Sequence, residues 1–444
     1  MTHYDVLIIG SGAAGQTVAA ECASGGRSVA VVDRLPFGGT CALRGCIPKK
    51  VLLSAAEAVG RARALHGKGV VGECAIDWPE LVERTRVHIA PTPDNTTAWM
   101  REMGIATITG DARFVGNDSM DVGGETLSAS AIVIATGARP IDLGIDGADL
   151  VLSSADFMDL ERMPGRIAFI GGGYISFEFS WLAHLAGAEV WILHRSAQVL
   201  KGFDPDLAAM LAERYRELSI TILTDAPVKR VERHGDGVAI VTGGGVVEAD
   251  IAVHGAGRIP DIDALDLAAA GVEHSRRGIA VTEQLRSVSN PVVWAAGDAA
   301  ALGAPLTPVA AAQGQVVAAG ILGRHATYDD GATPSVVFSD PPLARVGIDA
   351  ERAADDDTLE VRAYDMSGWF TQSRVGNTAA GARLVIDRAT GAIKGAHLLG
   401  VGADEIINIF AVAIQFGITL DDLRSVTWSY PALAYDINYL TGRY

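Results

Sequence analysis

The sequence predicts an α/β fold with two doubly wound, Rossmann-like nucleotide-binding domains and a C-terminal α+β domain. Two glycine fingerprints, Gly10-Ser-Gly12-Ala-Ala-Gly15 and Gly171-Gly-Gly173-Tyr-Ile-Ser176, each follow a short apolar run and open a helical pattern. They lie about 160 residues apart, too far for one tandem array. The chain has 444 residues, which favours about three domains.

The composition excludes several classes of protein. Hydrophobic residues make up 49% and charged residues 20%, which is typical of a globular chain. The net charge of −17 disfavours binding to nucleic acid or to an anionic membrane, and no apolar run reaches the length of a membrane helix. Residues 1–10 lack a basic segment, and four cysteines make no disulfide scaffold. We therefore expect a cytoplasmic protein with a small-molecule substrate.

The helices and strands are predicted from apolar runs and from the turn-forming residues that separate them. The first unit reads as a strand at 5–9, a helix at 16–24 and a strand at 28–32. The second reads as a strand at 167–170, a helix at 174–186 and a strand at 189–193. A helix at 309–322 precedes a linker at 323–333. The third domain then has strands around Val346, Leu384 and Gly395 and helices at 404–416 and 420–424.

The first fingerprint has all the parts of a dinucleotide site. Its glycines allow a tight turn, close approach of a pyrophosphate and close packing of helix on strand. The helix N-terminus then faces the phosphate charge. Asp33 ends the next strand, where a carboxylate accepts a hydrogen bond from a ribose hydroxyl.

The second fingerprint differs in its charge. Ser176 replaces the third glycine, and the following strand ends in His194-Arg195 without an acid. An acid there favours NAD, whereas Arg195 and Lys201 can pair with the 2′-phosphate of NADP. The alternative is that both are solvated surface cations. The pattern favours NADPH over NADH.

The strongest signal is the thiol segment, Gly38-Gly-Thr-Cys41-Ala-Leu-Arg-Gly-Cys46-Ile-Pro48-Lys49. Two cysteines precede a helix expected at 51–63, and a helix N-terminus favours a thiolate. A disulfide there is reducible by a neighbouring flavin. The alternatives are two structural cysteines or a metal pair, but zinc sites use closer spacing and further ligands, so no metal is expected. Cys22 lies mid-helix and is expected in the core.

These motifs resemble the flavin-dependent pyridine nucleotide–disulfide oxidoreductases, a family that includes glutathione reductase, dihydrolipoamide dehydrogenase and mercuric reductase. The similarity also covers Ala135-Thr136-Gly137, Gly255-Ala-Gly257-Arg258, Ala296-Gly297-Asp298 and Leu306-Thr307-Pro308. It implies FAD and NADPH as cofactors and a homodimer whose active sites are shared across the interface. It divides the chain into FAD-binding segments at 1–145 and 263–330, an NAD(P)H-binding segment at 146–262 and a dimerisation domain at 331–444.

The resemblance also assigns roles to residues. Cys46 would be the charge-transfer thiol against the flavin, and Cys41 the interchange thiol that meets substrate. Lys49 and Glu178 would form an ion pair near the flavin, and Tyr174 would gate the nicotinamide. The cofactor-binding set it implies comprises Gly10, Gly12, Ala14, Gly15, Asp33, Gly39, Thr40, Ala112, Thr136, Gly137, Gly171, Gly173, Ile175, Arg195, Lys201, Gly257, Arg258, Asp298 and Thr307.

The C-terminal segment departs from the family. The family has a His-Pro-Thr segment whose His is the acid/base for the interchange thiol, followed by a Glu. With Pro431 as the anchor, Tyr430 takes the place of the His and Tyr435 that of the Glu, and Asp436 follows. Tyrosine, with a pKa of about 10, is a poor base at neutral pH. The positions that resemble glutathione-contacting arginines hold Ala20 and Glu21, which argues against glutathione disulfide.

The expected function is that of an FAD-dependent NADPH oxidoreductase with a redox-active Cys41–Cys46 disulfide. Its expected substrate is a small disulfide or a related thiol-reactive compound other than glutathione disulfide. One alternative is a thioether-cleaving enzyme similar to 2-ketopropyl coenzyme M oxidoreductase/carboxylase, which also lacks the usual His. Another is a metal-ion or quinone reductase, which needs no acid/base for its thiols.

Overall fold

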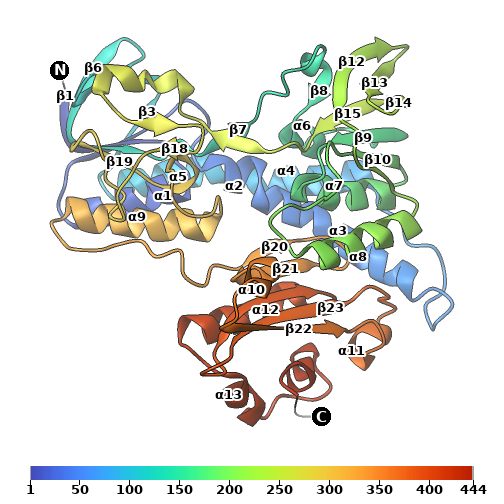
Figure 1. Ribbon diagram of the computed structural model, residues 1–444. Coiled ribbons are helices and arrows are strands. Elements are labelled where there is room, and N and C mark those ends of the chain that lie inside the picture. The colour runs from blue at the N-terminus through green and yellow to red at the C-terminus, as the bar shows by residue number, and fades with distance from the viewer. Residues whose placement is uncertain (1, 443–444) are drawn as a thin grey trace. The chain divides into compact units, whose positions relative to one another are not determined.

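The computed structural model describes residues 2–442, and the chain divides into two compact units (Figure 1). The first unit comprises residues 1–50, 83–141 and 258–330. The second comprises residues 51–82, 142–257 and 331–444. The predicted fold class is confirmed, because two mainly parallel sheets flanked by helices precede an antiparallel sheet with helices.

The first unit is built on a seven-stranded sheet in the order β3-β2-β1-β6-β5-β4, with β19 also paired to β6. The strands β3, β2, β1, β6 and β19 are parallel, whereas β4, β5 and β6 pair antiparallel. Residues 6–9 of β1 are buried throughout, as expected for a parallel strand covered on both faces. The strands are β1 (Thr2–Ile9), β2 (Val29–Asp33), β3 (Ala106–Thr109), β4 (Ala112–Gly116), β5 (Ser119–Val122), β6 (Glu125–Ile134) and β19 (Val293–Ala295).

Helices α1 and α5 pack on this sheet, and α1 lies beside α9. Cys22 of α1 is fully buried in the core, as expected. The helices and small elements are α1 (Ala13–Ser24), α2 (Gly39–Arg44), α5 (Thr92–Glu102), α9 (Thr307–Ile321), β7 (Ala138–Pro140), β16 (Arg258–Pro260), β17 (His274–Ser275), β18 (Gly278–Ile279), η2 (Asp263–Leu265), η3 (Leu267–Ala270) and η4 (Gly297–Ala299). Two helices, α3 (Cys46–Ala64) and α4 (Trp78–Ile89), cross the boundary between the units.

The second unit holds a five-stranded parallel sheet in the order β11-β10-β9-β15-β8. A three-stranded antiparallel sheet, β12-β13-β14, follows β11 in the chain. The elements are β8 (Val151–Leu152), β9 (Arg166–Ile170), β10 (Glu189–Leu193), β11 (Thr221–Leu223), β12 (Val228–His234), β13 (Gly237–Thr242), β14 (Val246–Ala249), β15 (Ile251–His254), η1 (Ala148–Leu150), α6 (Ser154–Met158), α7 (Tyr174–Leu185) and α8 (Pro205–Glu217).

The C-terminal part of the second unit is a five-stranded antiparallel sheet in the order β20-β21-β24-β23-β22. Helix α12 packs on β21 and β24 through Ile406, Ile407, Phe410 and Ala413, which recur at helical spacing. The elements are β20 (Ser335–Val337), β21 (Leu343–Gly347), β22 (Leu359–Asp365), β23 (Gly381–Asp387), β24 (Ile393–Leu399), α10 (Ala350–Ala354), α11 (Phe370–Ser373), α12 (Ala403–Gln415), α13 (Leu420–Ser425), η5 (Leu433–Asp436) and α14 (Ile437–Leu440).

One buried cluster explains why the second unit collects three separate stretches of chain. It joins Leu52 of α3, Phe169 of β9, Leu207 of α8, Val337 of β20 and Leu399 of β24. The division into four functional segments stays a prediction. Within residues 2–442, no helix is long and apolar enough to cross a membrane.

The boundaries of several elements differ from the sequence expectations. Helix α1 begins at Ala13 rather than at residue 16, because Gly12 caps it without a side-chain signal. Helix α9 begins at Thr307 rather than at residue 309, since Pro308 fits the first helical turn. Strands β20 and β22, at the edges of the C-terminal sheet, were not expected.

Candidate active site

The first glycine fingerprint is a close backbone approach between β1, α1 and the end of β6. Gly10 has φ +108°, and a Cβ there would lie 2.2 Å from the carbonyl oxygen of Ala135. A Cβ at Gly15 would lie 2.0 Å from the carbonyl oxygen of Gly10. Side chains are therefore excluded, and the N-terminus of α1 keeps free amides toward a phosphate.

Asp33, at the end of β2, is fixed by its neighbours. Its Oδ2 accepts hydrogen bonds from the Ser11 amide at 2.8 Å and the Ser11 hydroxyl at 2.6 Å. The Ser11 hydroxyl oxygen also accepts from the Gly38 amide at 3.0 Å, which joins the fingerprint to the thiol segment. Sequence reasoning missed Ser11, whose only signal is its place between two glycines.

Buried polar groups in the same unit fit the hydroxyl groups and phosphates of FAD. Within residues 2–442, the buried Thr136 hydroxyl has no hydrogen-bond partner. Burial raises the pKa of Asp298 in η4, although the nearby charge of Arg258 opposes the shift. Gln313, also missed, accepts from the Gly297 amide at 2.8 Å and holds η4 in place. A hydroxyl and a carboxyl kept away from water in this way are suited to a polar ligand.

The other predicted flavin-side residues lie in the same unit. A Cβ at Gly39 would lie 2.5 Å from the Cα of Gly12, so these two backbones nearly touch. The remaining positions are Ala14 in α1, Thr40 in α2, Ala112 at the start of β4, Gly137 just before β7 and Thr307 at the start of α9.

The two thiols occupy consecutive helices. Cys41 lies within α2, and Cys46 is the first residue of α3. The expected helix at 51–63 is thus five residues too short at its start, because Pro48 falls in the first turn, where proline is tolerated. Cys46 Sγ lies 3.7 Å from the Thr307 hydroxyl. An N-terminal position in a 19-residue helix favours a thiolate.

A shared proton distinguishes the two thiols. The hydrogen bond from Cys41, followed by smaller contributions from the Thr307 hydroxyl and the charge of Lys49, lowers the pKa of Cys46 to about 6 against the opposing effect of burial. The same hydrogen bond, together with burial, raises the pKa of Cys41. Near neutral pH, Cys46 is therefore the thiolate and Cys41 the donor.

The second fingerprint has the same close backbone approach as the first, but Ser176 replaces its third glycine. Gly171 has φ +112°, and a Cβ there would lie 2.4 Å from the carbonyl oxygen of Gly255. Ser176 is tolerated in place of a glycine because residue 255 is itself a glycine, whose Cβ would meet the Ser176 hydroxyl at 2.0 Å. Gly173 caps α7, and Ile175 is half-buried in its first turn.

His194 occupies the strand-end position of an acid. Its Nδ1 accepts from the Gly172 amide at 3.0 Å, so its Nε2 donates to the Gln198 carbonyl at 2.8 Å. Burial lowers its pKa, and the charges of Lys201 and Arg195 lower it further. The neutral ring leaves both cations near the fingerprint. Both are exposed, and neither forms an ion pair within residues 2–442.

The remaining predicted catalytic residues are placed separately. Tyr174, the first residue of α7, is 48% exposed. Glu178 is fully buried, and its Oε1 accepts from the Phe338 amide at 2.9 Å. Lys49 lies in the first unit and Glu178 in the second, so their ion pair stays a prediction. Gly257 has φ +118°, and Arg258 donates to the carbonyl of Ala138.

The C-terminal segment forms an aromatic cavity of about 220 Å³, lined by Trp369, Thr371, Tyr430, Tyr435, Asp436 and Tyr439 among others. The ring centroids of Tyr430 and Tyr435 are 4.8 Å apart, and those of Trp369 and Tyr439 are 5.2 Å apart. Tyr430 is 70% exposed. The rings of Tyr430 and Tyr435 therefore lie together, but they supply no imidazole.

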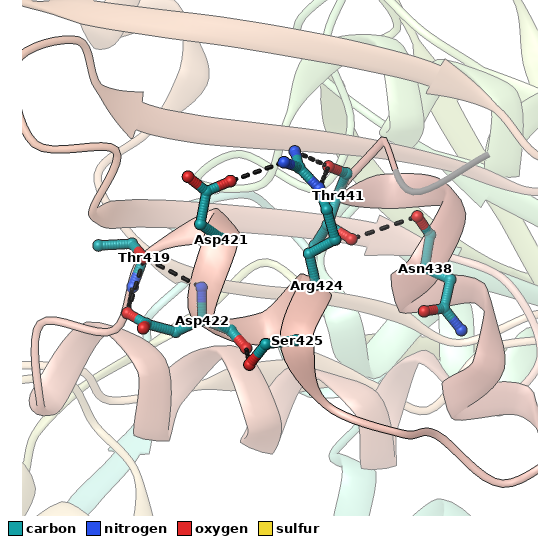
Figure 2. A network of polar contacts seen from close by, with 7 residues as sticks. All are labelled: Thr419, Asp421, Asp422, Arg424, Ser425, Asn438 and Thr441. Atoms are coloured by element: carbon teal, nitrogen blue, oxygen red, sulfur yellow. Dashed lines mark hydrogen bonds and ion pairs between the residues drawn. The ribbon is translucent and has the colours of Figure 1, made fainter.

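A polar network holds this segment onto α13 (Figure 2). Arg424 donates to the Thr441 carbonyl through Nε at 3.0 Å and Nη2 at 2.5 Å, and it pairs with Asp421 at 2.6 Å. A capping box between Thr419 and Asp422 fixes the start of α13. The chain from α13 to the end of α14, which carries the aromatic cavity's tyrosines, is thus held at both ends.

Comparison with known proteins places this geometry in a family. Residues 4–314 match the family described as pyridine nucleotide-disulphide oxidoreductase, and residues 333–439 match its dimerisation domain. The chain is 32% identical to a mercuric reductase of Staphylococcus aureus, over 97% of this chain and 80% of that protein. It is also 32% identical to a glutathione reductase of Burkholderia cepacia, over 99% of both.

A solved structure is similar over the whole length. The Cu(II) complex of the HOCl-induced flavoprotein disulfide reductase RclA from Escherichia coli has a TM-score of 0.90 and 27% identity, and the alignment covers 100% of both chains. The chain belongs to the pyridine nucleotide-disulphide oxidoreductase family, whose members are FAD-dependent, use NAD(P)H and act on sulfur groups. The matched dimerisation domain supports a homodimer.

Proposed function

We propose that the protein uses NADPH to reduce a small disulfide other than glutathione disulfide through Cys41 and Cys46. The observation that carries this proposal is the thiol pair, in which Cys41 donates to a Cys46 thiolate at the start of α3. One thiol is thereby kept as an anion and the other as its proton donor. Because the thiolate is the nucleophile in thiol–disulfide exchange, Cys41 becomes reactive when its proton passes to Cys46.

The two electrons that reduce the substrate come from the Cys41–Cys46 dithiol. Cys41 passes its proton to Cys46 and attacks one sulfur of the substrate, so the substrate S–S bond breaks, a mixed disulfide forms and one thiol leaves. Cys46 then loses its proton and attacks Cys41, which releases the second thiol and restores the Cys41–Cys46 disulfide. Bound FAD supplies the two-electron path from NADPH to that disulfide. Of the two departing thiolates, one takes up the proton that Cys46 releases and the other takes up a proton from the solvent.

The cofactor preference rests on charge. Arg195 and Lys201 flank the neutral His194 at the end of β10, where an acid would repel a 2′-phosphate. Each charge-assisted contact to phosphate contributes about 1.5–3 kcal/mol. NADPH is therefore the expected donor.

The substrate class follows from what the site lacks. Ala20 and Glu21 stand where glutathione-contacting arginines are expected, so an acidic disulfide gains no cation there. Tyr430 supplies no base near neutral pH, which makes exchange depend on the thiols themselves. In the proposed homodimer, the C-terminal segment of each subunit completes the active site of its partner, and the proposed compartment is the reducing cytoplasm.

Reduction of a thiophilic metal ion is the second candidate. Two vicinal thiols are soft ligands, and reduction of a bound ion needs no acid/base for the thiols. The names of similar proteins, a mercuric reductase and a Cu(II) complex of RclA, favour this alternative over thioether cleavage. In such a reaction the ion would bind as substrate to Cys41 and Cys46 and accept electrons supplied by NADPH.

One assay separates these candidates. NADPH oxidation is followed with cystamine, glutathione disulfide, Hg²⁺ and Cu²⁺, using the native holoenzyme and the variants Cys41→Ser and Cys74→Ser. We expect turnover of cystamine that is lost in Cys41→Ser and kept in Cys74→Ser, since Cys74 is exposed and lies in no helix or strand. Turnover of the metal ions alone would replace the disulfide with the second candidate.

A further inference from the structure

The aromatic cavity contains a buried carboxylate without a cation. Asp436 is 2% exposed, and its Oδ2 accepts from the Thr371 hydroxyl at 2.5 Å. Within residues 2–442, no Lys, Arg or His forms an ion pair with it. An ionised carboxylate without a counter-ion is costly to bury unless another group compensates it.

The walls of the cavity supply a second attraction for a positive charge. Tyr430, Tyr435, Tyr439 and Trp369 form a chain of edge-to-face rings, with centroids 4.8, 5.9 and 5.2 Å apart along it. Aromatic faces attract ammonium groups, most strongly when the site is desolvated. A cavity of about 220 Å³ has room for a small organic cation.

The negative charge of Asp436 attracts an incoming cation, whereas the nearby positive charge of Arg374 opposes it. Burial raises its pKa to about 6, whereas the Thr371 hydrogen bond and the charge of Arg374 lower it by smaller amounts. The carboxylate is therefore ionised at neutral pH, where aliphatic amines are protonated. Arg374 forms no ion pair with Asp436 within residues 2–442, and Asp436 itself lines the aromatic cavity.

We propose that the aromatic cavity binds the ammonium group of a small aliphatic amine, with Asp436 as its counter-ion and the tyrosine and tryptophan rings as its walls. Resting on the proposed function, this site selects disulfides that carry amino groups. The acidic chain, with a net charge of −17, attracts such a substrate and repels an acidic one.

Binding is tested without any reaction. Hexamethylenediamine, which cannot be reduced, is titrated calorimetrically into the native holoenzyme, with hexanediol as its neutral counterpart. We expect the diamine to bind, the diol not to bind, and Asp436→Asn to weaken diamine binding about tenfold or more. The control Asp357→Asn removes an exposed carboxylate that precedes β22 and does not line the cavity, and it should leave binding unchanged.

A second variant keeps the binding test informative if Asp436→Asn does not fold. Trp369→Leu removes one ring and keeps the carboxylate, and it should also weaken diamine binding. Equal affinity for diamine and diol, or diamine binding that survives both substitutions, would overturn the proposal.

Selectivity is measured separately with two disulfides of similar size, cystamine and dithiodipropionate. We expect Asp436→Asn to lower kcat/KM for cystamine about tenfold and to leave dithiodipropionate unchanged. An equal loss for both would make Asp436 a proton donor and overturn the cation site. Diamine binding through Asp436 without reduction of either disulfide would support the site and reject the proposed function. Reduction of both disulfides without diamine binding would do the reverse.

Discussion

The thiol segment and the aromatic cavity treat negative charge in opposite ways. At Cys46 a hydrogen bond from Cys41, the Thr307 hydroxyl and the charge of Lys49 together lower the pKa to about 6, so the anion is stabilised before any substrate arrives. At Asp436 burial dominates and raises the pKa to about 6, so the anion is penalised. In the thiol segment, neighbouring residues stabilise the anion that the redox reaction uses. In the aromatic cavity, the Asp436 carboxylate needs a bound cation or a proton to compensate its charge.

The largest effect is expected when the attacking thiol of the thiol segment is removed. Cys41→Ser should reduce disulfide turnover at least about 10³-fold, because the attacking sulfur is lost. The measurement is steady-state NADPH oxidation with cystamine, and Cys74→Ser serves as the matched control. Residual activity within tenfold of the native protein would show that Cys41 is not the group that meets the substrate.

The second-largest effect is expected when an acid/base pair is introduced into the aromatic cavity. Tyr430→His combined with Tyr435→Glu restores an imidazole–carboxylate pair, and a positioned acid/base is worth about 10²–10⁴-fold. Disulfide turnover near pH 7 should rise within that range. The native rate should increase with pH because the raised pKa of Cys41 keeps the attacking thiol protonated, and this increase should flatten in the double variant. Ser429→His places the same ring one residue away and should give no gain. An unchanged pH–rate profile in the double variant would show that another group supplies the proton.

The two nucleotide fingerprints also differ in charge: the first ends at the carboxylate Asp33, and the second at the cations Arg195 and Lys201. Asp33 accepts hydrogen bonds from Ser11, whereas Arg195 and Lys201 beside His194 form no ion pair with any residue from 2 to 442. Arg195→Ala should raise KM for NADPH about tenfold and leave KM for NADH unchanged. Arg233→Ala, on the exposed strand β12, is the control. Equal use of both cofactors by the native protein would refute the preference.

The smallest expected effect is on stability. Because the folded pKa of Asp436 lies above its ordinary value, the folded protein binds more protons than the unfolded chain, and stability falls as pH rises from about 4 to 6. Asp436→Asn keeps an acceptor for Thr371 and should raise the free energy of unfolding by about 1–3 kcal/mol near pH 8, with no gain near pH 4. Urea unfolding at both pH values checks this. A loss of stability at pH 8 would mean that the carboxylate is already compensated.

The sequence predicted the fold well where patterns are local. Both glycine fingerprints, their strands and the α+β character of the C-terminal part follow from spacing and apolar runs. The start of α3 was wrong because Pro48 suggests a break, although proline is accepted in a first turn. The edge strands β20 and β22 were missed because their pairing depends on strands distant in the chain.

The site was predicted in its residue types but not in its contacts. Ser11, Gln313 and His194 act through hydrogen bonds to backbone amides or to Asp33, which no spacing reveals. Asp436 follows the tyrosines in sequence. Its burial beside Thr371, 65 positions away, is a tertiary property. The lowered pKa of Cys46 likewise depends in part on the Thr307 hydroxyl, 261 positions away.

The central claim is that Cys46 is the stabilised thiolate and Cys41 its partner, and one absorbance titration tests it most directly. The Cys41→Ser holoenzyme keeps a hydroxyl donor toward Cys46. Without added reductant it should show the long-wavelength band of a thiolate beside the flavin, and the band should disappear as pH falls through about 6. Cys46→Ser should lack the band at every pH. A band that persists in Cys46→Ser, or a midpoint near the ordinary thiol value of about 8.5 in Cys41→Ser, would contradict the assignment.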